Sequence, residues 1–153
     1  MHFSDYMRDL VALLRKHRVE FAVCGGYAVA YYGFVRMTMD FDLLVLPTIK
    51  NATKIMRALD EFGFGSAGLT EETFTKEAVA VTLGEQPNQI DILTSIGSQP
   101  ARDILSNARL VMIEGMEMPI VDYADLIRAK KESARAKDLA DVEELEHLHS
   151  GED

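Results

Sequence analysis

The sequence predicts a mixed α/β domain of the α+β type, in which helices flank a largely antiparallel sheet and two helices end the chain. Two observations predict this fold class. Short apolar runs of strand length alternate with segments whose apolar residues recur at helical spacing. The first two strands are separated by a helix, and the later ones are expected to pair as hairpins. With 153 residues, no repeat and no linker-like tract, residues 1–153 are expected to form a single domain.

The chain is predicted to open with a helix, a strand and a short second helix. Residues 4–17 carry their apolar side chains on one helical face, and Ser4 is a suitable N-cap. Residues 20–24 (EFAVC) are apolar enough for a buried strand. Residues 26–32 have the length of a short helix, which Gly33 is expected to end.

A further strand and a longer helix follow. Residues 40–46 are an apolar run that stops before Pro47. Thr48 is a suitable N-cap for the next helix, which we expect to continue to about residue 62 and to end at Gly63. Residues 66–77 are polar and without periodicity, so no element is predicted there. The remaining predicted elements are strands over 78–83, 89–94, 109–113 and 116–121, and helices over 100–107, 123–134 and 137–149.

Composition and charge narrow the function classes. Hydrophobic residues make up 48% of the chain and charged residues 27%, the balance of a soluble globular protein. The net charge of −9 argues against an extended nucleic-acid groove, because such grooves are basic. A small acidic pocket for a metal–nucleotide complex is compatible with it. Residues 125–137 carry five basic and two acidic residues, so this block is the expected phosphate contact.

The sequence indicates a cytoplasmic protein. No apolar run approaches the roughly 20 residues of a membrane helix. The N-terminus lacks a basic start followed by an apolar core, so we expect no signal peptide. The single cysteine, Cys24, cannot form an internal disulfide and is expected to pack inside the first strand.

Two glycines, Gly25 and Gly26, stand between a predicted strand and a predicted helix. Glycine lets backbone N–H groups approach a ligand closely, and the N-terminus of a following helix favours a phosphate. The same pair also suits a tight strand-to-helix turn without a ligand. The glycine pair alone leaves both interpretations open.

Asp40 and Asp42 lie in an otherwise apolar strand, DFDLLV. Strand positions two apart point to the same face, so the two carboxylates share one face while Phe41 and Leu43 point into a core. Adjacent carboxylates repel each other and lose hydration, and a hard divalent cation such as Mg²⁺ offsets that cost. A strand edge on which both side chains are simply hydrated is the alternative.

Asp91 is a third acid within an apolar strand, QIDIL. If this strand pairs beside the strand of Asp40 and Asp42, three carboxylates converge. Three carboxylates can hold two Mg²⁺ ions, which clamp the attacking and leaving oxygens of a nucleotidyl transfer. A single aspartate that faces solvent is the alternative.

The combination resembles a known family. The segment GGYAVAYYGFVRMTMDFDLLV (25–45), Asp91 and the segment KKESARAKDLADVEEL (130–145) are together similar to the DNA polymerase β-like nucleotidyltransferase superfamily, and most closely to its AbiEii-type (minimal) group. The resemblance spans most of the chain, and the GG…R-x-T-x-D-x-D block is fairly specific. It implies a nucleotidyltransferase fold.

The resemblance also implies which residues bind the nucleotide. Gly25 and Gly26 would hold the triphosphate of an NTP. Arg36 and Thr38 match the R-x-T of the family, which braces the acidic strand or contacts phosphate. Arg135, in the C-terminal K-x4-R-x-K-D-x2-D pattern, is expected to contact phosphate as well.

Five further residues match positions that carry the chemistry in the family. Asp40 and Asp42 would bind both metal ions, and Asp91 would bind one of them and help to activate the acceptor. Lys130 and Lys137 match the two lysines of the C-terminal pattern and would act on phosphate or in catalysis. A basic helix face that is only hydrated is the alternative for these lysines.

Asp138 and Asp141 complete the C-terminal pattern. They lie three residues apart on one predicted helical face, where an aspartate can orient a lysine or arginine toward the site.

The function that the resemblance implies is metal-dependent transfer of NMP from an NTP to an acceptor hydroxyl on RNA, such as tRNA, or on protein. Mg²⁺ or Mn²⁺ would be the cofactor, and the role would lie in a toxin–antitoxin or phage-defence system. Longer members carry a larger helical C-terminal region, so a partner chain or a homodimer is expected to complete the site. The alternatives are a catalytically silent nucleotide-binding or regulatory module and a purely structural interaction protein.

Overall fold

A six-stranded mixed sheet forms the centre of the protein. The computed structural model describes residues 3–35, 40–65 and 68–150. The strand order is β3-β4-β2-β1-β6-β5. Three neighbouring pairs are antiparallel, while β2–β4 and β1–β6 run parallel, so the predicted largely antiparallel α/β sheet is confirmed. The strands are β1 (Phe21–Cys24), β2 (Asp40–Val45), β3 (Ala80–Leu83), β4 (Gln89–Leu93), β5 (Arg109–Ile113) and β6 (Met116–Ile120).

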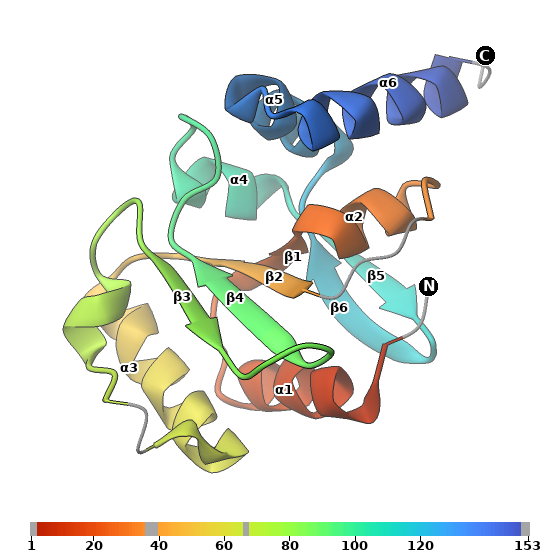
Figure 1. Cartoon of the computed structure of the whole chain (residues 1–153). Helices are drawn as coiled ribbons and strands as arrows, with labels where there is room; N and C mark the ends of the chain where they lie inside the picture. The colour runs from red at the N-terminus through yellow and green to blue at the C-terminus, as the bar shows by residue number, and fades with distance from the viewer. Residues whose placement is uncertain (1–2, 36–39, 66–67, 151–153) are drawn as a thin grey trace.

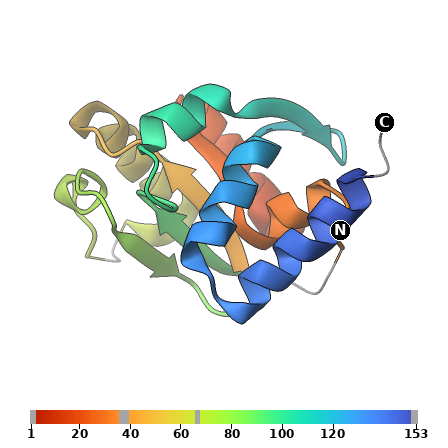
Figure 2. The ribbon, with the colours of Figure 1, turned by 90° about the horizontal axis from the view of Figure 1, so that it is seen from above.

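Helices cover both faces of this sheet. Figure 1 shows α1 and α3 on one side and α2, α4, α5 and α6 on the other. Seen from above in Figure 2, α5 and α6 lie side by side across the sheet. Within the described ranges, every helix is too short or too polar to cross a bilayer. The helices are α1 (Asp5–Lys16), α2 (Gly25–Tyr31), α3 (Ile49–Leu59), α4 (Ala101–Asn107), α5 (Tyr123–Ser133) and α6 (Ala136–Ser150), with short helical turns η1 (Asp60–Phe64) and η2 (Glu71–Phe74).

The predicted helix starts agree with the structure. The hydroxyl oxygen of Ser4 accepts a hydrogen bond from the Met7 N–H at the start of α1, and that of Thr48 accepts one from the Asn51 N–H at the start of α3. The segment over 66–77 differs from the prediction because η2 forms within it. Its Phe74 side chain is fully buried, and a single buried aromatic residue leaves no periodic signal in the sequence.

Strand β2 separates the hydrophobic core from the acidic face. Phe41 is fully buried, and its ring packs against Phe3 and Tyr27 at centroid distances of 5.6 and 5.3 Å. Asp40 and Asp42 point to the opposite face and are only half-buried. The alternation of acidic and apolar residues in DFDLLV therefore follows the pleat of the strand.

Candidate active site

The three predicted acids lie on neighbouring strands. Strands β2 and β4 are parallel, and their register places Asp42 directly beside Asp91 and Asp40 beside Gln89. Side chains at paired positions of neighbouring strands point to the same face of a sheet. Asp40, Asp42 and Asp91 therefore share one face, as the sequence predicts if these strands are neighbours.

Polar neighbours hold Asp91 and Asp40 in place. Thr82 Oγ1 on β3 donates to Asp91 Oδ1 at 2.7 Å, and Gln89 Nε2 donates to both Asp91 oxygens at 3.2 and 3.3 Å. Gln86 Nε2 donates to Asp40 Oδ1 at 3.3 Å. Sequence reasoning did not single out Thr82, Gln86 or Gln89. The position of Gln89 two residues before Asp91 was the one available signal, because it places both on one face.

Asp42 is the most perturbed acid of the group. Burial raises its pKa from the ordinary 3.8 to about 7, and the hydrogen bond to the Asp91 carboxyl and the charges of Asp91 and Asp40 act in the same direction. The charge of Lys137 lowers the pKa of Asp42 but does not offset these effects.

Gly25 makes room for the Asp42 carboxyl. A Cβ atom added at Gly25 would lie 2.0 Å from Asp42 Oδ2, and the glycine has a φ of +63°. Both the contact and the backbone conformation therefore require glycine at this position. The first residue of the predicted phosphate-binding pair lies directly against the acidic pair, at the start of α2.

A cavity of about 230 Å³ opens beside Asp42 and Gly25. Its lining residues come from the sheet, from the α5–α6 pair and from the segment after β4. The polar lining residues are Asp42, Lys130, Ser133, Arg135 and Asp138. The apolar ones include Leu93, Ile96, Leu126 and Ala129. Residues from the two motifs at opposite ends of the sequence thus line one cavity.

Lys130, one of the cavity-lining residues, joins α5 to α6. Its Nζ lies 3.2 Å from Asp138 Oδ1 and 3.0 Å from Asp141 Oδ2, and all three side chains are buried. The two aspartates on one face of α6 thus hold a basic side chain, while the prediction that they orient it toward a catalytic site stays a prediction. Lys130 neutralises two carboxylates within the protein, and these ion pairs hold α5 and α6 together. Lys130 also lines the cavity.

Asp138 collects three hydrogen bonds at the start of α6. Burial alone would raise its pKa, but hydrogen bonds from Ser133 and Arg135, together with the charge and hydrogen bond of Lys130, lower it to about 2. Arg135 Nε donates to Asp138 Oδ2 at 2.7 Å, while two-thirds of the Arg135 side chain remains exposed. Arg135 is thus anchored at one nitrogen and open to the cavity and to solvent.

The donor chemistry of the acidic face fits a hard divalent cation. Asp42 and Asp91 supply carboxyl oxygens from adjacent strands, and oxygen ligands of this kind are those that Mg²⁺ prefers. As the side chains stand, no group of three or more His, Cys, Asp or Glu in the described ranges is arranged to hold a metal ion. Any ligand set would therefore be built on the Asp42–Asp91 pair, with Asp40 beside it.

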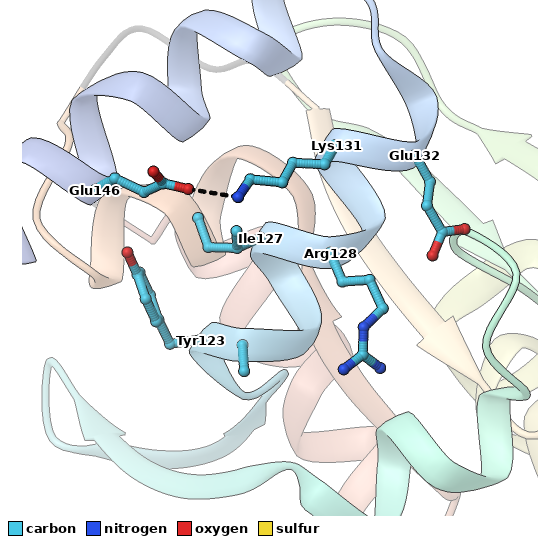
Figure 3. A pocket seen from close by; sticks show the side chains of 7 residues that line it. Tyr123, Ile127, Arg128, Lys131, Glu132 and Glu146 are labelled. Carbon is cyan, nitrogen blue, oxygen red and sulfur yellow. Dashed lines mark ion pairs between the residues drawn. The ribbon is translucent and has the colours of Figure 1, made fainter.

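A larger hollow in the described part of the surface lies elsewhere. It measures about 610 Å³ and runs along the outer side of α5 and α6. Figure 3 shows Tyr123, Ile127 and the Lys131–Glu146 ion pair, 2.8 Å long, on one side of α5, with Glu132 reaching away from them. None of the predicted site residues lines this hollow, so the smaller cavity beside Asp42 is the candidate site.

The fold of this chain is similar to that of a solved structure. No protein-family model matches the chain, and no curated protein sequence matches it. A crystal structure from Thermotoga maritima, described as that of a "putative nucleotidyltransferase", aligns with 94% of this chain and 88% of its own, with a TM-score of 0.54 and 18% sequence identity. The chain shares this fold. The nucleotidyltransferase fold predicted from the sequence is therefore confirmed, while the AbiEii-type subgroup stays a prediction.

The structure brings most of the predicted site residues into one region. Gly25, Asp42, Lys130 and Arg135 line the cavity, with Asp91 beside Asp42. Lys137 is exposed, and its charge acts on Asp42. Gly26 is buried inside α2. The predicted phosphate-contacting residues Arg36 and Thr38 lie outside the described residues. The individual roles of all these residues stay predictions.

Proposed function

We propose that this protein is a metal-dependent nucleotidyltransferase that transfers NMP from an NTP to an acceptor hydroxyl. The acceptor hydroxyl loses its proton to a base, for which Asp91 is the candidate, and its oxygen forms a bond to the α-phosphorus. The bond from that phosphorus to the bridging oxygen of the β-phosphate breaks, and pyrophosphate leaves. The observation that carries the proposal is the Asp42–Asp91 pair, a half-buried carboxyl pair on adjacent strands beside Gly25 and a cavity with cationic side chains.

Asp42, Asp91 and Asp40 are the residues that would hold Mg²⁺ or Mn²⁺. The ion, when bound, would supply positive charge that stabilises the phosphate oxygens during transfer. Lys137 is exposed and close enough to affect the pKa of Asp42, so its ammonium group is suited to contact the phosphates of an incoming nucleotide. Arg135 has free guanidinium nitrogens for the same purpose, because only its Nε is held by an aspartate.

We also propose the narrower assignment to the AbiEii-type group, supported by the match of the sequence motifs. It carries with it a cytoplasmic toxin or phage-defence role, an acceptor hydroxyl on tRNA, other RNA or protein, and completion of the site by a partner chain or a second copy. The cavity is open to solvent beside the exposed Arg135, which leaves an approach for a macromolecular acceptor.

Nucleotide binding can be tested by thermal unfolding with each of the four NTPs, with and without Mg²⁺ or Mn²⁺. A ligand present at about 100 times its Kd stabilises a protein by about 2.7 kcal/mol, which such an assay detects readily. The stabilisation should require the metal and should be lost in Asp42→Asn. Asp9→Asn is the matched control, because Asp9 is an exposed aspartate on α1 away from the site. The absence of metal-dependent stabilisation by any NTP would refute the proposal.

Transfer itself needs a second assay. Incubation with NTPs labelled at the α-phosphate should place label on RNA or on protein, and Asp42→Asn and Asp91→Asn should abolish it. Metal-dependent binding without label transfer to RNA, to protein or to the chain itself would instead favour the catalytically silent nucleotide-binding module.

A further inference from the structure

One loop supplies part of the apolar lining of the cavity. After β4, residues 95–99 (SIGSQ, the 95–99 loop) lead to α4, and Ile96 and Gly97 from this loop line the cavity. The other apolar lining residues are Leu93 of β4 and Leu126 and Ala129 of α5. This apolar lining suits an apolar, flat group rather than phosphate.

The start of the loop is firmly anchored. The Thr94 side chain is fully buried, and the Thr94 N–H donates to the Val79 carbonyl at 3.0 Å. The Val79 N–H in turn donates to Thr94 Oγ1 at 2.9 Å. The loop thus leaves the sheet from a fixed point, and its position further along is decided by other contacts.

Two residues of α5 hold the rest of the loop. The Ser98 N–H donates to Glu132 Oε2 at 2.6 Å, and Arg128 Nη1 donates to Gln99 Oε1 at 2.5 Å. Glu132 and Arg128 are one helical turn apart on the same side of α5, and Figure 3 shows the Glu132 carboxylate beside the loop. Both side chains are exposed, so the two hydrogen bonds form in contact with water.

Gly97 is the point at which the loop backbone packs closely against α5. A Cβ atom there would lie 3.0 Å from Glu132 Oε2 and 3.3 Å from the Ala129 Cα. A second cavity of about 300 Å³ is lined by Gly97, Ser98 and Gln99 of the same loop. The loop therefore borders two cavities and is joined to α5 by the contacts described above.

We infer that Glu132 and Arg128 are positioning residues that hold the 95–99 loop against α5, so that Ile96 and Gly97 form the wall on which the nucleoside part of the NTP packs. The inference rests on the proposed function. The acids and Lys137 hold the metal and the phosphates, and the loop serves the base and sugar. Loss of the two contacts should therefore weaken binding of the nucleoside and leave binding of the phosphates unchanged.

The test compares two ligands in the presence of Mn²⁺: an NTP, and inorganic triphosphate, which lacks the nucleoside. The variants are the double substitution Glu132→Ala/Arg128→Ala and the single substitution Glu132→Gln, whose amide oxygen still accepts from the Ser98 N–H. Lys131→Ala is the matched control, because Lys131 lies between them in the sequence but pairs with Glu146 on the outer side of α5.

The double variant should bind the NTP about tenfold more weakly and inorganic triphosphate as the wild type does. Glu132→Gln and Lys131→Ala should bind both ligands like the wild type. Faster hydrogen exchange of the Gly97 and Ser98 amides in the double variant should accompany the loss.

Equal weakening of both ligands, or an NTP affinity unchanged in the double variant, would overturn the inference and leave the proposed function intact. A wild-type protein that binds neither ligand would refute the proposed function and the inference together.

Discussion

Asp42→Asn is expected to stabilise the metal-free protein at neutral and alkaline pH while it removes metal binding. The wild-type carboxyl is half-buried beside Asp91, and burial and its acidic neighbours raise its pKa to about 7. Ionisation of Asp42 in the folded protein places negative charge beside Asp91 and Asp40. Asparagine retains the shape and can donate to Asp91, but it carries no charge.

The magnitude follows from the pKa shift. Below about pH 4, Asp42 is protonated in both the folded and the unfolded chain, and the stability contributed by its raised pKa is fully present. Between 3.8 and about 7 the folded state keeps a proton that the unfolded state has lost, so the free energy of unfolding falls as pH rises. At about 1.4 kcal/mol per pH unit, the wild type loses about 4 kcal/mol over this range. The free energy of unfolding of Asp42→Asn does not fall in this way, because asparagine does not ionise.

Urea denaturation at pH 4 to 8.5 without divalent metal measures the effect. The difference in free energy of unfolding between Asp42→Asn and wild type should grow from pH 4 to pH 7 and then stay constant. Mg²⁺ should reduce the pH dependence of the wild type and leave that of the variant unchanged. Asp9→Asn, on the exposed side of α1, should follow the wild type at every pH. A pH slope in Asp42→Asn equal to that of the wild type would refute the electrostatic argument.

Three other substitutions test separate parts of the site. Lys130→Met removes the buried ammonium that Asp138 and Asp141 share and should cost about 3–5 kcal/mol in urea denaturation, against less than about 1 kcal/mol for the exposed Lys131→Met. Gly25→Ala should lower the melting temperature more than Gly115→Ala, because both glycines have positive φ but only the first has a carboxylate in its Cβ space. Lys137→Ala should weaken metal-dependent NTP binding in calorimetric titration with little change in melting temperature, since its side chain is exposed.

Much of the fold could be predicted because its elements carry strong local signals. The capped helices after Ser4 and Thr48 and the apolar strands lie within a few residues of their predicted bounds. The short turn that buries Phe74 could not be predicted, since it depends on packing against α3 rather than on periodicity. The parallel pairing of β2 with β4 is also a long-range property. From the sequence alone, it could be stated only as the condition under which Asp40, Asp42 and Asp91 converge.

The acids of the site could be predicted because charged residues in apolar strands are unusual, and their shared face follows from the strand period. The residues that contact these acids and the cavity-lining loop could not be predicted. Thr82 contacts Asp91 through the register of the β3–β4 hairpin, and Glu132 contacts the 95–99 loop across 34 positions of sequence. Such residues are ordinary surface residues in the sequence, and only tertiary packing places them beside the site.

The chain contains two buried or half-buried carboxylate pairs, and the contrast between them argues for an external cation at one. Asp138 and Asp141 share the buried ammonium of Lys130, and hydrogen bonds and that charge hold the pKa of Asp138 at about 2. Asp42 and Asp91 also lie side by side, yet the pKa of Asp42 is raised to about 7 because burial and its neighbours outweigh the nearest cationic influence. Among the described residues, no ion pair joins Asp42 or Asp91 to a lysine or arginine, and the Gly25 side of this pair is kept open by the absence of a side chain. A divalent cation that arrives with a nucleotide would supply positive charge at this pair, and metal binding would then be tied to the presence of substrate.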